Sequence, residues 1–236
     1  MEKKKTLFES FVCIFTKPRN AFEAIVQKPH WLFPFLILVV LMMGMQWAIR
    51  DIVVSDTVRH LQNQGLDPEK IEAIQNQIIK MRFINLAMIP VTLGIVWLLL
   101  AGVLFFIGNT LMGGQTHFKT IFSIVAWAEL VEVPGIFIKT FLILAKGTFQ
   151  GVTTSLVVLL PFLQEGENPS FFYRLFSKID LFTGWKMILW IIGLSIAYRF
   201  PIPKTTRLVL FLWGFWILAS VGLSYWLGHL FRFSSV

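Results

Sequence analysis

Two glutamates, three residues apart in a long apolar stretch, are the residues of this sequence best suited to chemistry. At this spacing Glu129 and Glu132 lie on one face of a helix. A carboxylate inside a membrane segment is costly and is by default a candidate for function. The pair therefore indicates either a proton- or cation-binding site of a transporter, or a structural pair neutralised by a basic or polar partner. We favour the structural interpretation.

A basic partner for the pair is present on the same stretch, since Lys139 follows Glu132 by seven residues and lies on a similar helix face. Other reactive groups are scattered. The four histidines lie at expected span ends or in connections: His30, His60, His117 and His229. The sequence has no zinc-protease motif, no serine-hydrolase motif and no clustered metal ligands. It therefore predicts no enzyme, no metal and no cofactor.

The composition defines the environment of these groups. Of the 236 residues, 56% are hydrophobic and only 14% are charged, whereas an average soluble domain has roughly 25% charged residues. The mean hydropathy is +0.71. This composition excludes disorder and argues against a soluble enzyme, so the chain is expected to lie in a bilayer. The net charge of +8 then indicates membrane orientation and lipid contact, and no nucleic-acid binding.

Five apolar segments position these residues as membrane helices, each near the roughly 20 residues that a span needs. The predicted spans are 31–49, 83–108, 119–144, 185–200 and 208–231. A further apolar segment, 148–163, is short for a span and long for a loop. We expect a re-entrant or interfacial helix there, between spans three and four, and six spans remain the alternative.

Two segments outside the spans have helical periodicity. Residues 1–30 form an amphipathic amino-terminal segment, with one helix in 6–15 and a second beginning at Pro18, and both are expected to lie in the membrane interface. We separate this segment from a membrane domain over 31–236. Asp67 and Pro68 are typical of a helix start. The apolar stripe after them is expected to extend span two on the water side: Ile71, Ile74, Ile78 and Met81.

Basic residues predict the orientation. The amino-terminal segment carries Lys3, Lys4, Lys5, Lys17, Arg19 and Lys28. The connection between spans four and five carries Arg199, Lys204 and Arg207. Five spans put both groups on one side, and the positive-inside rule makes that side cytoplasmic. The longer connections, 50–82 and 145–184, then lie outside.

Small residues at four-residue spacing recur in the spans: Gly44 and Ala48; Gly193 and Ala197; and Ser220, Ser224 and Gly228. Such stripes let helices approach closely in lipid. They predict a packed bundle and leave room for a homo-oligomer or another membrane-protein partner.

Three stretches of the chain resemble the bacterial branch of the YIP-domain membrane proteins, named for Ypt/Rab-interacting protein. The first is similar to the family's entry to span one: Pro18, Phe22, Pro29 and Pro34. The second comprises Gly113, Gly114 and Pro134. The third is similar to the family's Asp-Leu-Phe pattern at span four: Asp180, Phe182, Trp185 and Gly193. The resemblance implies a five-span helical protein with a cytoplasmic amino terminus and no established catalytic residues.

The sequence thus favours a non-enzymatic, multi-pass protein of the bacterial cytoplasmic (inner) membrane. It would organise membrane lipids or partner proteins, with anionic lipids at the amino terminus. Eukaryotic relatives are implicated in membrane traffic and membrane shaping, as the resemblance implies. The alternative is a small-molecule or ion transporter that uses Glu129 and Glu132.

Overall fold

The structure is a computed structural model that describes residues 7–160 and 171–233, with side chains in the last helix described as far as Gly222. Within these ranges the regular structure is helical, and strand pairing is limited to one isolated bridge. The α-helices are α1 (Leu7–Thr16), α2 (Pro18–Gln27), α3 (Leu32–Ala48), α4 (Arg50–Asn63), α5 (Pro68–Phe106), α6 (Phe118–Ala128), α7 (Glu132–Lys146), α8 (Phe171–Phe176), α9 (Leu181–Tyr198) and α10 (Ile202–Phe233). The shorter helices are η1 (Ile107–Leu111), η2 (Glu129–Val131) and η3 (Leu156–Leu159).

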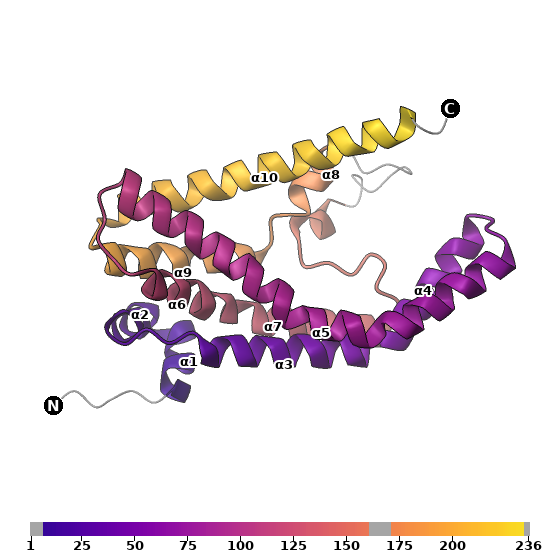
Figure 1. The fold of residues 1–236 in the computed structure, drawn as a ribbon, viewed down its shortest axis with the longest axis horizontal. Coiled ribbons are helices and arrows are strands. Elements are labelled where there is room, and N and C mark those ends of the chain that lie inside the picture. The colour runs from indigo at the N-terminus through magenta and orange to yellow at the C-terminus, as the bar shows by residue number, and fades with distance from the viewer. Residues whose placement is uncertain (1–6, 161–170, 234–236) are drawn as a thin grey trace.

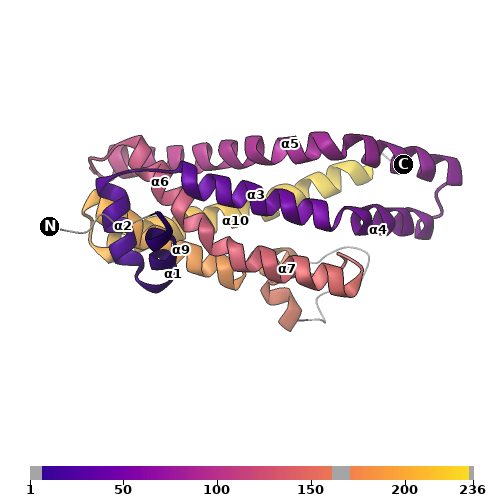
Figure 2. The same ribbon diagram turned by 90° about the horizontal axis from the view of Figure 1, so that it is seen from below.

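The long helices run along one axis of an elongated bundle (Figure 1). We call one end the amino-terminal end, and it is formed by α1, α2, α6 and the last turns of α9. The opposite end is the hairpin end, where α4 and the first half of α5 project beyond the other helices (Figure 2). Helix α1 and the end of α10 lie at opposite ends, as an odd number of crossings requires.

The number of membrane crossings agrees with the prediction of about five. Four helical segments are long and apolar enough to span a membrane: Pro68–Leu111, Phe118–Lys146, Leu181–Tyr198 and Ile202–Gly222. Helices α3 and α4 reach that length only together, and they are bent by 53° at their junction. Helix α3 supplies the apolar part of this fifth crossing, whereas α4 is rich in charged residues.

Span two is the carboxyl-terminal part of one continuous helix, α5. Asp67 caps α5 by accepting the amide N–H of Glu69 at 3.1 Å, and Pro68 takes the first helical position. The helix then continues for 39 residues through Pro90. The predicted helix start at Asp67-Pro68 is therefore confirmed, and the stripe after it does continue into span two as one helix.

Span three changes its winding at the two glutamates. Helix α6 tightens into the 3-10 turn η2, and α7 resumes at Glu132. Pro134 explains the change, since its ring would meet the carbonyl group of Leu130 one turn earlier in a regular α-helix. Residues three apart eclipse in a 3-10 turn. The break therefore places Glu129 and Glu132 almost directly above one another.

The segment after α7 differs from the expected re-entrant or interfacial helix. Gly147 ends α7 with a left-handed φ of 66°, and Gly151 turns again at φ 68°. From there to Leu160 the chain is irregular except for the single 3-10 turn η3. This segment pairs with the start of α9, because the amide of Leu156 donates to the carbonyl oxygen of Ile179 at 2.9 Å. The end of the predicted segment, 161–163, lies outside the described residues, and the broken crossing that the structure does contain is the α3–α4 pair.

Candidate functional site: a lysine between two glutamates

The two glutamates share a single cation, Lys186 of α9. The ammonium nitrogen Nζ of Lys186 lies 3.2 Å from Oε2 of Glu129 and 3.0 Å from Oε1 of Glu132. The three side chains are only 17%, 15% and 24% exposed, in the order Lys186, Glu129 and Glu132. We call these three residues the charge triad. It joins span three to span four at the 3-10 turn.

Helix α9 reaches this position because its first turn is held against α7. Asp180 caps the helix by accepting the amide N–H of Thr183 at 2.6 Å. Phe182 packs on Gly135, where a side-chain Cβ would stand only 2.9 Å from the ring carbon Cδ2. Lys186 follows Phe182 by four residues and therefore lies on the same helix face. The contact that docks the ring thus also presents the lysine to the glutamates.

The predicted partner Lys139 takes no part in the triad. Among the described residues, the ion pairs of both glutamates are with Lys186. Lys139 lies two helical turns beyond Glu132, which is about 10 Å along the axis and leaves the two charges far apart. Helical spacing relates residues of one helix, so it could not identify a lysine on another helix. The signal that could have indicated Lys186 is its position as a charged residue just inside the predicted fourth span, 185–200.

The triad is an internally paired site. One ammonium group donates to both carboxylates, and the ring of Trp190 lies 5.8 Å from the same nitrogen. A buried charge is tolerated when it is paired and hydrogen-bonded in this way. Over the described ranges, no group of three or more His, Cys, Asp or Glu side chains is placed to hold a metal ion. The arrangement links two helices through a cation that the protein itself supplies.

The motif residues near span one meet those of span four at the amino-terminal end. Phe22 is fully buried against Gly193, where a Cβ would stand 2.6 Å from Cγ2 of Ile124 and 3.1 Å from the Phe22 ring. No larger residue fits at Gly193 without displacing one of them. Pro18 begins α2 and Pro34 lies buried in the first turn of α3. Together they position the helix that carries Phe22.

A tryptophan of span three is hydrogen-bonded to the connection between α2 and α3. The indole nitrogen Nε1 of Trp127 donates to the carbonyl oxygen of His30 at 2.7 Å. This acceptor lies one residue after Pro29, in the connection between the two helices. The ring of Trp127 also stacks on Phe33 at 5.7 Å. Near the same end, the ring of Trp185 contacts Phe15 of α1 edge to face at 5.6 Å.

The glycine pair serves the turn between spans two and three. Gly113 has a left-handed φ of 72°, which a residue with a side chain rarely adopts. Gly114 receives the ring of Tyr198, which would collide with any Cβ at that position. The hydroxyl of Tyr198 donates to the carbonyl oxygen of Leu104 at 3.0 Å, so the ends of α5 and α9 are bonded together.

Of the predicted small-residue stripes, the one on α9, Gly193 and Ala197, packs against other helices of the same chain. Gly193 is buried and Ala197 is half-buried on α9, whereas Gly44 and Ala48 are exposed. Nothing lies within 4 Å of a Cβ built on Gly44. The hydroxyl of Ser220 donates to the carbonyl oxygen of Ile217 in its own helix. The side chains at Ser224 and Gly228 lie outside the described residues.

A buried carboxylate at the hairpin end was not singled out by the sequence. Asp56 of α4 accepts the hydroxyl of Thr148 at 2.6 Å and the amide N–H of Phe149 at 2.8 Å, through Oδ2. Its other oxygen lies 3.6 Å from the guanidinium of Arg59. The Thr148 hydrogen bond, helped by the Phe149 amide and by Arg59 and opposed by burial, lowers the pKa of Asp56 below its ordinary value. This group, which we call the Asp56 clasp, fastens α4 to the chain after α7.

The amino-terminal end also carries an open groove between α2 and the α9–α10 turn. The groove measures about 510 Å³, and its polar lining comes from Arg19, Glu23, Ser195 and Arg199. Arg199 has a left-handed φ of 54° and is exposed. Arg19 is paired with Glu23 at 3.1 Å in an exposed contact. The groove therefore presents two guanidinium groups beside the apolar rim of α9.

The fold and the buried charges define a polytopic α-helical membrane protein whose paired ionic site binds its own helices together. A Yip1 domain matches residues 12–224 of the chain. The protein therefore belongs to the Yip1-domain family, and the predicted resemblance to YIP-domain proteins is confirmed. No curated protein gives a significant match. No solved structure matches significantly either.

Proposed function

We propose that this YIP-type protein is non-enzymatic and organises membrane lipids or a partner protein through its amino-terminal end. The observation that carries the proposal is the way α1 and α2 are held. Ile14, Ala21, Phe22 and Ile25 are fully buried against the bundle. The polar face of the two helices is thereby fixed outward in one orientation, as a binding surface requires.

The outward face has the chemistry of an anion-binding surface. Its exposed basic residues are Lys17, Arg19, Lys28 and Arg199, and Glu23 is the acidic residue of the groove between them. Basic residues at a membrane surface attract anionic lipids by about 1 kcal/mol each. Phosphate headgroups, or an acidic segment of a partner, match this surface.

The charge triad supports a structural role in preference to transport. A transport site needs a carboxylate that exchanges its ligand with water, whereas Lys186 already occupies both carboxylates. Neither the amino-terminal groove nor the pocket at the hairpin end is lined by Glu129 or Glu132. The triad acts in this proposal as the joint that keeps spans three and four together beneath the binding face.

The lipid part of the proposal is tested by replacing the basic face. The variant Lys17→Gln/Arg19→Gln/Lys28→Gln/Arg199→Gln changes exposed side chains and leaves the buried residues of α1 and α2 intact. Native membrane discs extracted with a polymer are analysed for lipid content. We expect the wild type to be enriched in anionic lipid and the variant to lose this enrichment. Equal lipid content in both would reject the lipid part.

The partner part is tested by proximity labelling in cells. The labelled neighbours of the wild type are compared with those of the same variant. A matched control is Lys70→Gln/Lys80→Gln, which removes exposed charge from α5 at the hairpin end. We expect neighbours that are lost from the basic-face variant but kept in the control. If both variants label the same neighbours as the wild type, no partner depends on this face.

The orientation is part of the same proposal. We propose that the amino-terminal end faces the cytoplasm of a bacterial inner membrane, with residues 1–30 as an amphipathic cytoplasmic segment that precedes the five-span membrane domain 31–236. The positive-inside rule supports this side. A reporter fused after Val236 is expected to read outside, and a second reporter before Met1 is expected to read cytoplasmic. A cytoplasmic reading at the carboxyl terminus would contradict five crossings.

A further inference from the structure

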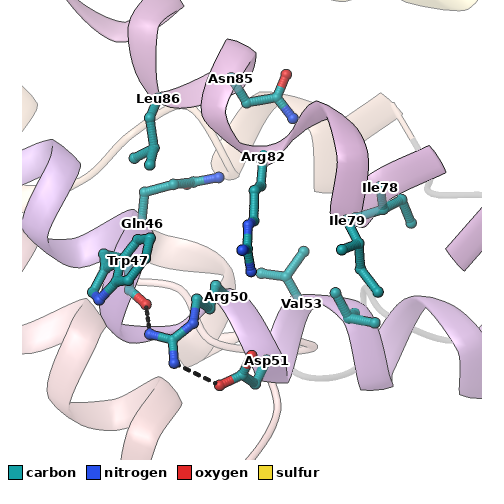
Figure 3. A pocket seen from close by; sticks show the side chains of 11 residues that line it. Gln46, Trp47, Arg50, Asp51, Val53, Ile78, Ile79, Arg82, Asn85 and Leu86 are labelled. Carbon is teal, nitrogen blue, oxygen red and sulfur yellow. Dashed lines mark hydrogen bonds and ion pairs between the residues drawn. The ribbon is translucent and has the colours of Figure 1, made fainter. Parts of the chain in front are cut away.

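A small pocket lies at the hairpin end, in the angle between the bent α3–α4 pair and α5. Its cavity measures about 90 Å³. A single water needs about 10–15 Å³ of such space, so the cavity has room for a phosphate group. The polar groups that line it are Gln46, Arg50, Asp51, Arg82 and Asn85. Figure 3 shows Gln46, Arg50 and Arg82 around the gap between the helices, with Asn85 on the adjoining turn of α5.

The pocket contains an arginine without an anionic partner. Arg82 points from α5 into the gap, and the amide of Gln46 extends toward it from α3 (Figure 3). The guanidinium carbon of Arg82 lies 4.8 Å from the centre of the ring of the neighbouring Phe83. Among the described residues no carboxylate pairs with Arg82. A guanidinium group in this position favours a bidentate acceptor such as phosphate.

The second arginine is held loosely at the bend. Arg50 donates to the carbonyl oxygen of Trp47 at 2.9 Å and lies 4.6 Å from the centre of the Trp47 ring. It also pairs with Asp51 at 3.2 Å, but the Asp51 side chain is 81% exposed. An ion pair this exposed contributes little to stability. Arg50 can therefore turn from Asp51 toward an anion in the gap.

The surroundings place the pocket at a membrane boundary. Trp47 is 46% exposed, as expected of a tryptophan in the interfacial belt. On α5, large apolar side chains are exposed just beyond Arg82, beside the polar Asn85: Phe83, Ile84 and Met88. On the other side α4 carries charged residues. A ligand in the pocket would thus have its charge at the headgroup level and its apolar part along α5.

We propose that this pocket binds the phosphate of an anionic phospholipid, in the leaflet at the hairpin end. Arg82 and the amides of Gln46 and Asn85 hold the phosphate oxygens, and Arg50 turns in to complete the site. The charges of Arg50, Arg82 and Asp51 leave one positive charge, which one phosphodiester neutralises. A zwitterionic lipid would bring an ammonium group that restores the excess. The site lies at the opposite end of the bundle from the proposed basic face and does not depend on it.

The proposal is tested by native mass spectrometry of the detergent-purified protein. The probes are phosphatidylglycerol and phosphatidylcholine, titrated separately into the wild type, Arg82→Gln and Arg50→Gln/Arg82→Gln. Charge-assisted hydrogen bonds of this kind are worth enough that their loss weakens binding about tenfold. We expect the first phosphatidylglycerol to bind about tenfold more weakly to Arg82→Gln and more weakly still to the double variant. Phosphatidylcholine should bind equally weakly to all three.

The matched control is Lys70→Gln, which removes one exposed positive charge from the same helix away from the pocket. It should bind phosphatidylglycerol like the wild type. Arg82→Lys keeps the charge but not the two-pronged geometry, and it should fall between wild type and Arg82→Gln. Circular dichroism at 222 nm checks that each variant is folded, and Arg82→Gln removes no ion pair among the residues that the structure describes. Equal affinity in wild type and Arg82→Gln would overturn the site.

A competition experiment distinguishes a phospholipid headgroup from free phosphate as the ligand of this pocket. Inorganic phosphate at millimolar concentration should leave the bound phosphatidylglycerol in place, because it has no acyl chains to lie along α5. Displacement at that concentration would overturn the lipid assignment in favour of a free-phosphate site. If Lys70→Gln also loses phosphatidylglycerol binding, the proposed pocket is wrong, and the lipid is attracted by the overall positive charge of the protein.

Discussion

The two ends of the bundle are held together by different means. At the amino-terminal end, apolar side chains pack into space that only glycine leaves, as Phe22 and Ile124 do at Gly193. At the hairpin end, the helices are polar and project beyond the others, and Asp56 clasps α4 to the chain after α7. The first kind of joint depends on shape, whereas the second depends on ionisation. Substitutions and pH should therefore affect the two ends differently.

The location of the family motifs follows the same division. Phe22, Gly114, Phe182 and Gly193 all take part in close ring-to-glycine contacts. The Asp56 clasp and the Arg82 pocket involve none of the motif residues. The motif residues thus take part in packing the spans against one another, and the polar groups of the hairpin end lie apart from them.

The largest effect is expected from the charge triad, which lies between the two ends. Lys186→Met leaves two poorly hydrated carboxylates facing each other, and it should lower the free energy of unfolding by about 3 kcal/mol. Reversible unfolding in mixed detergent micelles measures this loss. The variant Lys186→Met/Glu129→Gln/Glu132→Gln removes all three charges and should recover most of the stability. If the triple variant stays as unstable as Lys186→Met, the triad is not held by charge pairing.

The next effect tests the shape-dependent joint. Gly193→Ala forces a methyl group against Ile124 and Phe22 and should destabilise the protein by about 2 kcal/mol through overpacking. Unfolding in the same micelles measures it. Gly44→Ala is the matched control, since nothing lies within 4 Å of a Cβ at that exposed position. If Gly44→Ala is equally destabilising, the cost at Gly193 does not come from close packing, because any glycine-to-alanine change in a membrane helix would then have the same effect.

A smaller effect is expected at the clasp, and it should depend on pH. Asp56→Asn keeps an oxygen acceptor but loses the charge, and it should cost about 1.5 kcal/mol at neutral pH. The pKa of Asp56 is lowered in the folded protein, so the wild-type advantage is complete above the ordinary pKa of aspartate. That advantage is lost as the pH falls through the lowered value.

The measurement is the difference in unfolding free energy between wild type and Asp56→Asn from pH 7 downward. This difference should disappear in acid, whereas the cost of Gly193→Ala should not change with pH through this group. A pH-independent cost at Asp56 would contradict the ionic character of the hairpin end.

The smallest effect concerns one hydrogen bond. Trp127→Phe keeps most of the ring but removes the N–H that reaches the carbonyl oxygen of His30. We expect a loss of about 1 kcal/mol in unfolding free energy. Hydrogen exchange at the start of α3 should increase in the same variant. Unchanged exchange there would show that ring packing alone holds the α2–α3 connection.

Much of the architecture was predictable because it depends on local composition. Apolar length defined the spans, and the pair Asp67-Pro68 marked the start of a helix that the structure continues through span two. Periodicity predicted that α1 and α2 lie in the membrane interface. It could not show that their apolar side chains Ile14 and Phe22 are buried in the interior of the bundle. The start of the predicted segment, from Thr148, was harder, since its course depends on hydrogen bonds to Asp56 of a distant helix.

The sequence by itself determined the membrane class, the five crossings and the two glutamates at one face of span three. These follow from hydropathy and helical spacing, which act within a few turns of the chain. Only the tertiary structure decided that Lys186, and not Lys139, neutralises the glutamates. The physical reason is reach: a charge two turns away on the same helix stays about 10 Å distant, whereas a neighbouring helix brings its lysine to hydrogen-bonding distance once Phe182 has docked on Gly135.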